Sequence, residues 1–423
     1  MGRLRDDARA IWSAALAAVA PEPLIAARLT VRGPRGEVFV DGRSLDPPLE
    51  LDAVGRIVVV GGGKAASGMA AGVESLLGAE RLARQVAAGL VSVPAGCGRR
   101  LVRTEVRQTR PAGVNLPTPE VVAATDEIIR TVSCLTAADL VVVVLTGGGS
   151  ALLATPRAGV TLAEKIETTM RLAAAGADIR SLNAARRRLS AVKGGGLALA
   201  SRAGRMLVLV LSDVVGDDLA VVASAPCLPD RMAAGAAFTT PEGCRVEHVL
   251  VGGNSTAVAA AATAARRAGY RVTRAETVPG GPADEVGGRL AEEGLALVAA
   301  ARGDGAPRAA IEGGESTVVV PREHGSGGRN QQTAVAALAR LRGRVWPEEL
   351  AVASIGTDGE DGPTDAAGGF ADAAVAAAAR TLDVDAALAR RDAHPLLAAA
   401  DGLIRTGPTG TNVADLRIVL ARP

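Results

Sequence analysis

Acidic side chains crowd into one short, glycine-rich segment of the chain. Asp358, Glu360, Asp361 and Asp365 all fall within GTDGEDGPTDAAGG (356–369), which contains no Lys or Arg. Carboxylates this close repel one another unless a cation or hydrogen-bond donors offset their charge. Because Mg²⁺ prefers carboxylate oxygen ligands, Asp358 and Asp361 are candidate metal ligands.

A second acidic loop, SDVVGDDLA (212–220), follows an apolar run. Asp213 ends the expected strand abruptly and suits a metal ion or a substrate hydroxyl, whereas Asp217 or Asp218 suits the cap of a following helix equally well. Asp213 and Asp358 are therefore candidates for two roles, metal ligand and acceptor of a hydroxyl proton. The sequence does not apportion these roles between them.

A cation lies at the mouth of a glycine loop. Lys64 follows the apolar run IVVV (57–60) and three glycines, Gly61, Gly62 and Gly63. A glycine loop that opens a helix and carries an ammonium group suits a phosphate. The plain alternative is a tight strand–helix turn with a solvated lysine.

The same loop satisfies the GxGxxA dinucleotide pattern through Gly61, Gly63 and Ala66. Glu80 even falls at the sequence distance at which that pattern expects a ribose-binding acid. However, Glu80 precedes the next strand-like run instead of ending it, and Lys64 occupies the loop. A dinucleotide site is therefore disfavoured.

Further glycine loops carry groups that suit a nucleotide. LTGGGSALL offers an anion nest with a hydroxyl, and HGSGGRNQQ places a guanidinium at an expected helix start, where it suits bidentate phosphate binding. The candidate cofactor contacts in these and two similar loops are Gly148, Gly149, Ser150, Asn254, Glu315 and Asn330, and Arg329 is a candidate catalytic residue. A magnesium–nucleotide complex accounts for the acidic and the cationic loops together, whereas the alternative is a set of unrelated surface loops.

The elements that must position these residues recur along the chain. Six apolar runs end in glycine and precede alanine-rich helical stretches: 56–64, 140–150, 206–218, 246–255, 309–316 and 350–359. This alternation predicts an α/β fold with parallel or mixed sheets covered by helices on both faces. A length of 423 residues predicts two domains. The turn-rich stretch 225–245 marks the expected boundary, which gives domains 1–235 and 236–423.

Composition excludes several functions. A net charge of +2 and an aromatic content of 1% argue against nucleic acid or an anionic membrane as a partner. The four cysteines form no CxxC pair, which fits a reducing cytoplasm. The spacing of Ile11, Leu16 and Val19 favours an amphipathic helix over a secretory signal.

Several motifs together resemble the glycerate 2-kinase family, whose members carry a MOFRL domain. They are GGGKAASGMA, LTGGGSALL, LSDVVGDDLAVVAS, GGES, GGRNQQ, GTDGEDGPTDAAGG and TGPTGTNVADL, in this order. The resemblance implies transfer of the γ-phosphoryl group of ATP to the 2-hydroxyl of D-glycerate, with Mg²⁺. It also implies a smaller C-terminal domain, an active site in the interdomain cleft, and catalytic roles for Lys64, Arg329 and Asp358.

The chain departs from the family pattern at 110–120, at 223–227 and at Gln332. The acceptor is therefore less closely defined than the reaction, and a kinase of a related small sugar acid is an alternative. An NAD-linked hydroxypyruvate reductase and a non-catalytic metabolite sensor are two others. A homodimer is left open.

Overall fold

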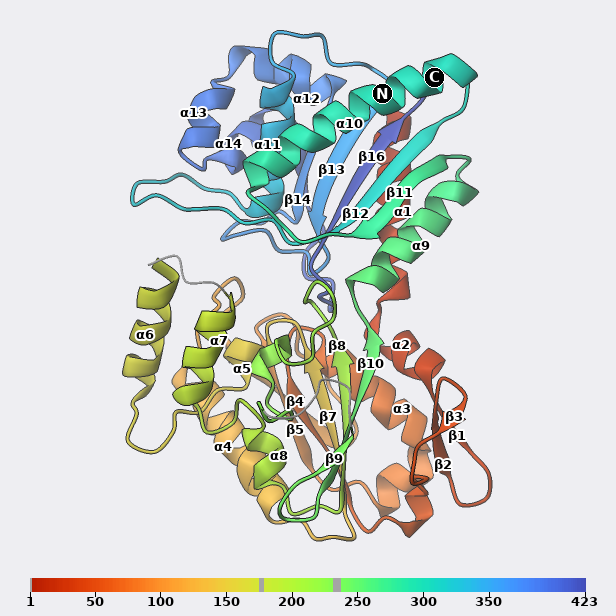
Figure 1. Ribbon diagram of the computed structural model, residues 1–423, viewed down its shortest axis with the longest axis vertical. Coiled ribbons are helices and arrows are strands. Elements are labelled where there is room, and N and C mark those ends of the chain that lie inside the picture. Colours follow the sequence, from red (N-terminus) through yellow and green to blue (C-terminus); the bar gives the residue numbers. More distant parts are fainter. Residues whose placement is uncertain (1, 175–178, 231–236) are drawn as a thin grey trace. The chain divides into compact units, whose positions relative to one another are not determined.

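The computed structural model describes residues 2–174, 179–230 and 237–423, which form two compact units (Figure 1). One, here called the nucleotide-fold unit, comprises 20–253 and 410–412. The other, the C-terminal unit, comprises 1–19, 254–409 and 413–423. Each contains a sheet flanked by helices, which confirms the predicted α/β class.

The sheet of the nucleotide-fold unit has the strand order β6-β5-β4-β7-β8-β10-β9. Its strands are β4 (Ile57–Gly62), β5 (Gly89–Pro94), β6 (Thr104–Arg110), β7 (Leu140–Thr146), β8 (Arg205–Leu211), β9 (Phe238–Thr239) and β10 (Arg245–Gly252). All neighbours pair in parallel except β9, which is antiparallel to β10. The fully buried β4 and β7 follow directly from their uninterrupted apolar sequences.

Helices cover both faces of this sheet. The helices of this unit are α2 (Pro21–Arg28), α3 (Ala66–Arg84), α4 (Pro119–Ser133), α5 (Gly149–Leu152), α6 (Leu162–Ala174), α7 (Ile179–Arg188) and α8 (Gly196–Ala200), of which α6 and α7 pack against each other. Ile128 of α4 and Leu197 of α8 share one buried core with Val58 and Val143 of the sheet. Helix α3 packs against β4, β5 and β7 and lies on the other side of the sheet in Figure 1. Short strands β1 (Leu29–Arg32), β2 (Glu37–Val40) and β3 (Arg43–Ser44) form a separate antiparallel sheet.

The order of the strands marks one position at which a ligand is expected. From β4 the chain adds β5 and β6 on one side, and then adds β7, β8 and β10 on the other. The direction of winding therefore reverses between β4 and β7. In open α/β sheets, ligands bind at the carboxyl ends of the strands at such a reversal.

The C-terminal unit contains a mixed sheet of order β11-β12-β16-β13-β14-β15. Its strands are β11 (Arg271–Thr277), β12 (Arg308–Gly314), β13 (Leu350–Gly356), β14 (Gly368–Asp372), β15 (Leu403–Ile404) and β16 (Asp415–Ala421). Only β11 and β12 pair in parallel. The main helices are α1 (Gly2–Ala18), α9 (Asn254–Arg267), α10 (Ala283–Asp304) and α11 (Arg329–Arg340), and shorter ones are α12 (Ala373–Ala378), α13 (Val384–Ala389) and α14 (Ala393–Ala399). Helices α10 and α11 pack together, as do α1 and α9.

The compact units differ from the predicted domains 1–235 and 236–423 in two places. Helix α1 belongs to the C-terminal unit, where Asp7 accepts hydrogen bonds from Tyr270 and Arg422. Strand β10 belongs to the first sheet because it pairs in parallel with β8, so the units part after Gly253. The stretch 274–288 contains the end of β11 and the start of α10. Within the described residues, no single helix is long and apolar enough to cross a membrane, although α1 and α2 meet that criterion as a bent pair.

Candidate active site

The nucleotide-fold unit brings three predicted residues or loops to one edge of its sheet. Lys64 follows β4, the glycine loop 147–150 follows β7, and Asp213 follows β8. These strands are parallel neighbours in the order β4-β7-β8, so their carboxyl ends lie side by side. The structure therefore gathers Lys64, Ser150 and Asp213 at the reversal of the sheet.

The loop before Lys64 is held tightly against β7. Gly63 has φ of 140°, and a Cβ there would lie 2.0 Å from Oγ1 of Thr146, so only glycine fits. The Lys64 N–H donates to the carbonyl of Gly147, and the Ala65 N–H donates to Thr146 Oγ1. Gly61 and Gly62 lie within β4 and pair with its neighbours. The glycines thus set the path of the backbone, and the charged group that this loop carries is the Lys64 ammonium.

A second cation, which sequence analysis missed, lies beside Lys64. A Cβ on Gly148 would lie 3.4 Å from Cγ of Lys64 and 3.6 Å from Nη2 of Arg110. Arg110 is the last residue of β6 and is 4% exposed. Its guanidinium donates to the carbonyls of Pro111 and Val114 in the 110–120 segment that departs from the family pattern.

Asp213 lies close to an amide from a distant part of the chain. A Cβ on Gly147 would lie 2.2 Å from Nδ2 of Asn412 and 2.6 Å from Oδ2 of Asp213. Glycine is therefore required for this approach, and Gly147, Asp213 and Asn412 form one cluster. Asn412 lies in the TGPTGTNVADL motif, but its chemistry gave no reason to select it over its neighbours.

A buried lysine supports the glycine loop after β7. The Lys193 ammonium is 4% exposed and donates to the Ser150 carbonyl at 2.8 Å, to Ser150 Oγ at 3.0 Å and to the Ala223 carbonyl at 3.2 Å. Ser150 Oγ also contacts Ser224 Oγ at 2.9 Å. Burial, together with nearby cations, lowers the pKa of Lys193 well below its usual value. In the sequence, Lys193 follows Arg186, Arg187 and Arg188, and nothing there distinguishes it.

The segment that accepts this lysine has an unusual backbone. Ala223, Ser224 and Ala225 have φ of 50°, 61° and 55°. Non-glycine residues rarely adopt this region, and such strain is found most often at functional sites. Ala225 stands where the family usually has glycine, so the departure at 223–227 adds to the strain.

The C-terminal unit gathers its own set of polar residues. Strand β16 runs antiparallel to both β12 and β13, with Asp415 opposite Gly314 and Gly356. Its first residue, Asp415, therefore lies at the carboxyl ends of both neighbours. The loops that carry Glu315 and Asp358 begin at those same ends.

Arg329 begins α11, as expected, but its guanidinium is bound within the protein. Nε and Nη2 contact the two carboxylate oxygens of Asp415 at 2.7 and 2.9 Å, and Nη1 contacts Oε1 of Glu315 at 2.9 Å. Asp415 is completely buried, whereas the Glu315 side chain is 51% exposed. Burial opposes the charge, but these carboxylates raise the pKa of Arg329 well above its usual value.

Asp361 caps the N-terminus of α11. One carboxylate oxygen accepts from the N–H of Asn330 at 2.9 Å, and the other accepts from the N–H of Gln331 at 2.8 Å. The side chains of Asn330 and Gln331 donate to the same oxygens. Burial raises the pKa of Asp361 to about 6. Hydrogen-bond donors of this helix therefore offset much of the negative charge of the acidic segment.

The other candidates in this unit have different surroundings. Asp358 is 9% exposed, and its Oδ1 accepts from the N–H of Glu360 at 3.0 Å. Asn254 donates to the carbonyls of Val413 and Asp415 and accepts from Thr277, so it anchors the start of β16. Within the described residues, no three His, Cys, Asp or Glu side chains are grouped closely enough to hold a metal ion.

Within the described residues, the hydrogen bonds of the Gln332 side chain lie outside both groups of candidate residues. Its amide donates to Oδ1 of Asp284 at 2.7 Å and to the Leu388 carbonyl at 3.2 Å. A glutamate would place a second carboxylate against Asp284. The amide therefore suits the packing of α11 against α10 and α13.

The comparisons agree with these motifs. A family model described as a domain of unknown function (DUF4147) matches residues 7–252, and the MOFRL family model matches residues 308–415. The chain is 33% identical to human glycerate kinase over 99% of this chain and 94% of that protein. It is 30% identical to a glycerate 2-kinase of Pyrococcus horikoshii over 95% of this chain and 94% of that protein.

A solved structure agrees as well. The crystal structure of glycerate kinase from Thermotoga maritima superposes with a TM-score of 0.78, at 30% identity, and the match covers 100% of both chains. Sequence identity of this extent and a shared fold confirm the resemblance drawn from the motifs. The chain belongs to the glycerate kinase family.

Proposed function

We propose that this protein transfers the γ-phosphoryl group of ATP to the 2-hydroxyl of D-glycerate and forms 2-phosphoglycerate. The observation that carries the proposal is the full-length similarity to proteins named glycerate kinase and glycerate 2-kinase. The geometry supports it, because cations and carboxylates of the expected kinds lie at strand ends in both units. Phosphoryl transfer requires mainly such positioning and charge stabilisation.

In the nucleotide-fold unit, Lys64 and Arg110 bind the negative charge of a phosphate or of the acceptor carboxylate. Both pass beside Gly148, so an anion above the 147–150 loop meets two cations. Asp213 orients the acceptor hydroxyl or helps to hold the metal. Asn412 lies beside Asp213.

In the C-terminal unit, Arg329 stabilises charge on the transferred group. Asp415 binds Nε and Nη2 of this guanidinium, and the third nitrogen, Nη1, contacts the half-exposed Glu315. A phosphoryl oxygen that displaces Glu315 binds Nη1 of Arg329, and the ion pair between Arg329 and Asp415 stays intact. Asp358 shares with Asp213 the roles of hydroxyl contact and metal ligand.

Mg²⁺ is the metal that these residues suit. It is commonly bound by one or two carboxylates together with phosphate oxygens and water, so either Asp213 or Asp358 suits it without a preformed cage. When bound, it neutralises charge on the phosphates. Both oxygens of Asp361 accept bonds from α11, so ligation by Asp361 requires these bonds to break, and the metal role stays with the other two aspartates.

The reductase alternative finds little support in the fold. Strand β5, next to β4, ends at Pro94, and the residues after it, Ala95 and Gly96, provide no acid for a ribose. Glu80 lies within α3.

Four expectations from the sequence remain predictions: a cytoplasmic location, the domain limits 1–235 and 236–423, a shared cleft and a homodimer.

A paired assay tests the proposal. ADP release is measured with Mg-ATP and D-glycerate, and NADH oxidation is measured with hydroxypyruvate. We expect ADP release that requires the acceptor, stops with EDTA and returns with Mg²⁺. NADH oxidation without ADP release indicates the reductase, and nucleotide binding without either reaction indicates a sensor.

A further inference from the structure

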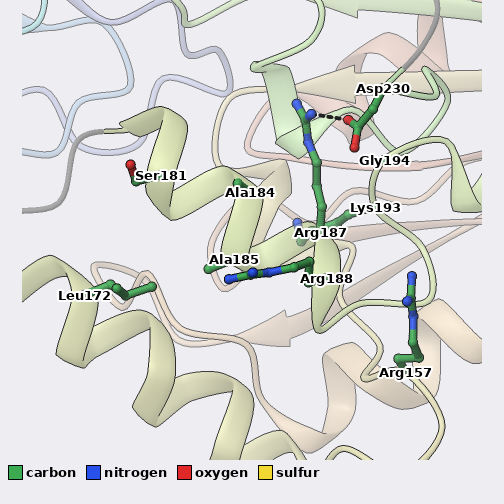
Figure 2. Close-up of a pocket in the computed structure, with 10 residues that line it drawn as sticks. All are labelled: Arg157, Leu172, Ser181, Ala184, Ala185, Arg187, Arg188, Lys193, Gly194 and Asp230. Carbon is green, nitrogen blue, oxygen red and sulfur yellow. Dashed lines mark hydrogen bonds and ion pairs between the residues drawn. The ribbon is translucent and has the colours of Figure 1, made fainter.

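A cationic pocket lies beside α7 in the nucleotide-fold unit (Figure 2). Its volume is about 610 Å³, within the range of small-molecule sites. Arg157, Arg187, Arg188, Lys193 and Gly194 line it. These residues define what we call the α7 pocket.

The positive charge of the α7 pocket is poorly balanced. Arg187 pairs with Asp230, as Figure 2 shows. Arg157 and Arg188 are exposed, and neither side chain forms an ion pair or hydrogen bond with a described residue. Most other arginines for which the structure gives contacts bind a carboxylate, so this excess is local.

Two further cations on α6 and α7 add to the positive charge of this region. Lys165 of α6 is 3% exposed, and its ammonium has no hydrogen-bond partner among the described residues. Among the described residues, the Arg186 guanidinium forms one hydrogen bond, to Oδ1 of Asn183 at 3.3 Å. Burial and then the charge of Arg186 lower the pKa of Lys165 to about 8. Burying cations without anions is costly, and an anion in the pocket would offset that cost.

We propose that the α7 pocket binds the phosphate groups of a small organic polyanion. Guanidinium groups match phosphate oxygens in a planar, bidentate geometry. Two of them without a described partner, on Arg157 and Arg188, favour a ligand with more than one negative charge. Lys193 connects the pocket to the edge of the sheet where β7 ends, because its ammonium donates hydrogen bonds to Ser150 of the loop after β7.

Two sources of phosphate fit this chemistry: the nucleotide and the phosphorylated acid. The choice of these two sources rests on the proposed function. The binding of phosphate in the α7 pocket does not depend on it. The probes are therefore inorganic tripolyphosphate, ADP and 2-phosphoglycerate, each titrated by calorimetry without turnover.

The variant is the double substitution Arg157→Ala/Arg188→Ala. Both side chains are exposed and form no ion pair with a described residue, so the fold should be unaffected, which a thermal melt verifies. The matched control is Arg100→Ala, because Arg100 is an exposed arginine of the same unit that does not line the pocket. We expect the affinity of the double variant for tripolyphosphate to fall by about tenfold or more, and that of the control to stay within about twofold.

The organic probes identify the source. A loss confined to ADP assigns the pocket to the nucleotide, and a loss confined to 2-phosphoglycerate assigns it to the phosphorylated acid. Equal affinities of the double variant and the parent for all three probes would overturn the proposal, as would a parent that binds none of them. Absence of ADP formation in a protein whose α7 pocket binds phosphate would refute the proposed reaction and leave the pocket standing.

Discussion

Arg329→Lys keeps the charge of the side chain and removes the planar fork that holds Asp415. In the structure the fork makes two contacts with Asp415, at 2.7 and 2.9 Å, and one with Glu315, at 2.9 Å. A lysine retains at most one well-aligned bond to Asp415, which stays buried. Each lost charge-assisted bond contributes about 1.5–3 kcal/mol, and the retained charge recovers part, so we expect unfolding to become easier by ~3 kcal/mol.

Tryptophan fluorescence in urea follows this change selectively. The chain has two tryptophans, Trp12 and Trp346, and both are buried in the C-terminal unit that contains Arg329. At a urea dependence of ~3 kcal/mol/M, the midpoint should fall by about 1 M. Arg340→Lys is the matched control on α11, because Arg340 pairs with Glu292 at the surface and its replacement should cost below ~0.5 kcal/mol.

The same variant separates structure from catalysis. If Arg329 also stabilises the transferred phosphoryl group, kcat per folded molecule should fall by at least ~10²-fold, with a smaller change in KM for ATP. Equal urea midpoints for Arg329→Lys and Arg340→Lys would refute the structural account of the ion pair. A normal kcat in the folded variant would remove Arg329 from the catalytic residues.

Three further perturbations test other parts of the account. Asp358→Asn should lower kcat by about 10²–10⁴-fold, and a near-normal kcat at saturating Mg²⁺ would make the acidic loop purely structural. Gly147→Ala places a Cβ 2.2 Å from Nδ2 of Asn412 and should lower kcat by at least ~10-fold, whereas Gly303→Ala, where nothing lies within 4 Å of the added carbon, should not. Burial lowers the pKa of Lys165 from 10.5 to about 8. The free energy of unfolding should therefore rise as pH rises from about 8 to 10.5, because the buried side chain loses its charge at a lower pH than it does in the unfolded chain. Thermal melts should show this rise, up to about 3 kcal/mol, and Lys165→Met should flatten it; an unchanged rise would contradict the burial of its charge.

The sequence predicted the strands well because their signal is local. All six apolar runs that end in glycine are strands, and the residues after β4, β7 and β8 lie together because parallel neighbours share an edge. A strand buried on both faces must be apolar throughout, and a short run is sufficient to show it.

Hydrogen-bond partners were harder to predict because they come from distant parts of the chain. Asp415, the partner of Arg329, is 86 residues away, and nothing near Arg329 in the sequence indicates it. Asp361 looked like a metal ligand because its neighbours are acidic, yet its oxygens face the N-terminus of α11. Arg110 and Asn412 reach the nucleotide-fold edge only through the tertiary structure.

The position of the phosphate in the product tests the central claim most directly. After incubation of the protein with Mg-ATP and D-glycerate, ³¹P NMR identifies each phosphorus compound in the mixture. The account predicts ADP and 2-phosphoglycerate in equal amounts, with no product when D-glycerate is left out. Formation of 3-phosphoglycerate would contradict the assignment of the 2-hydroxyl, and unchanged ATP in the presence of Mg²⁺ and D-glycerate would contradict the proposed function itself.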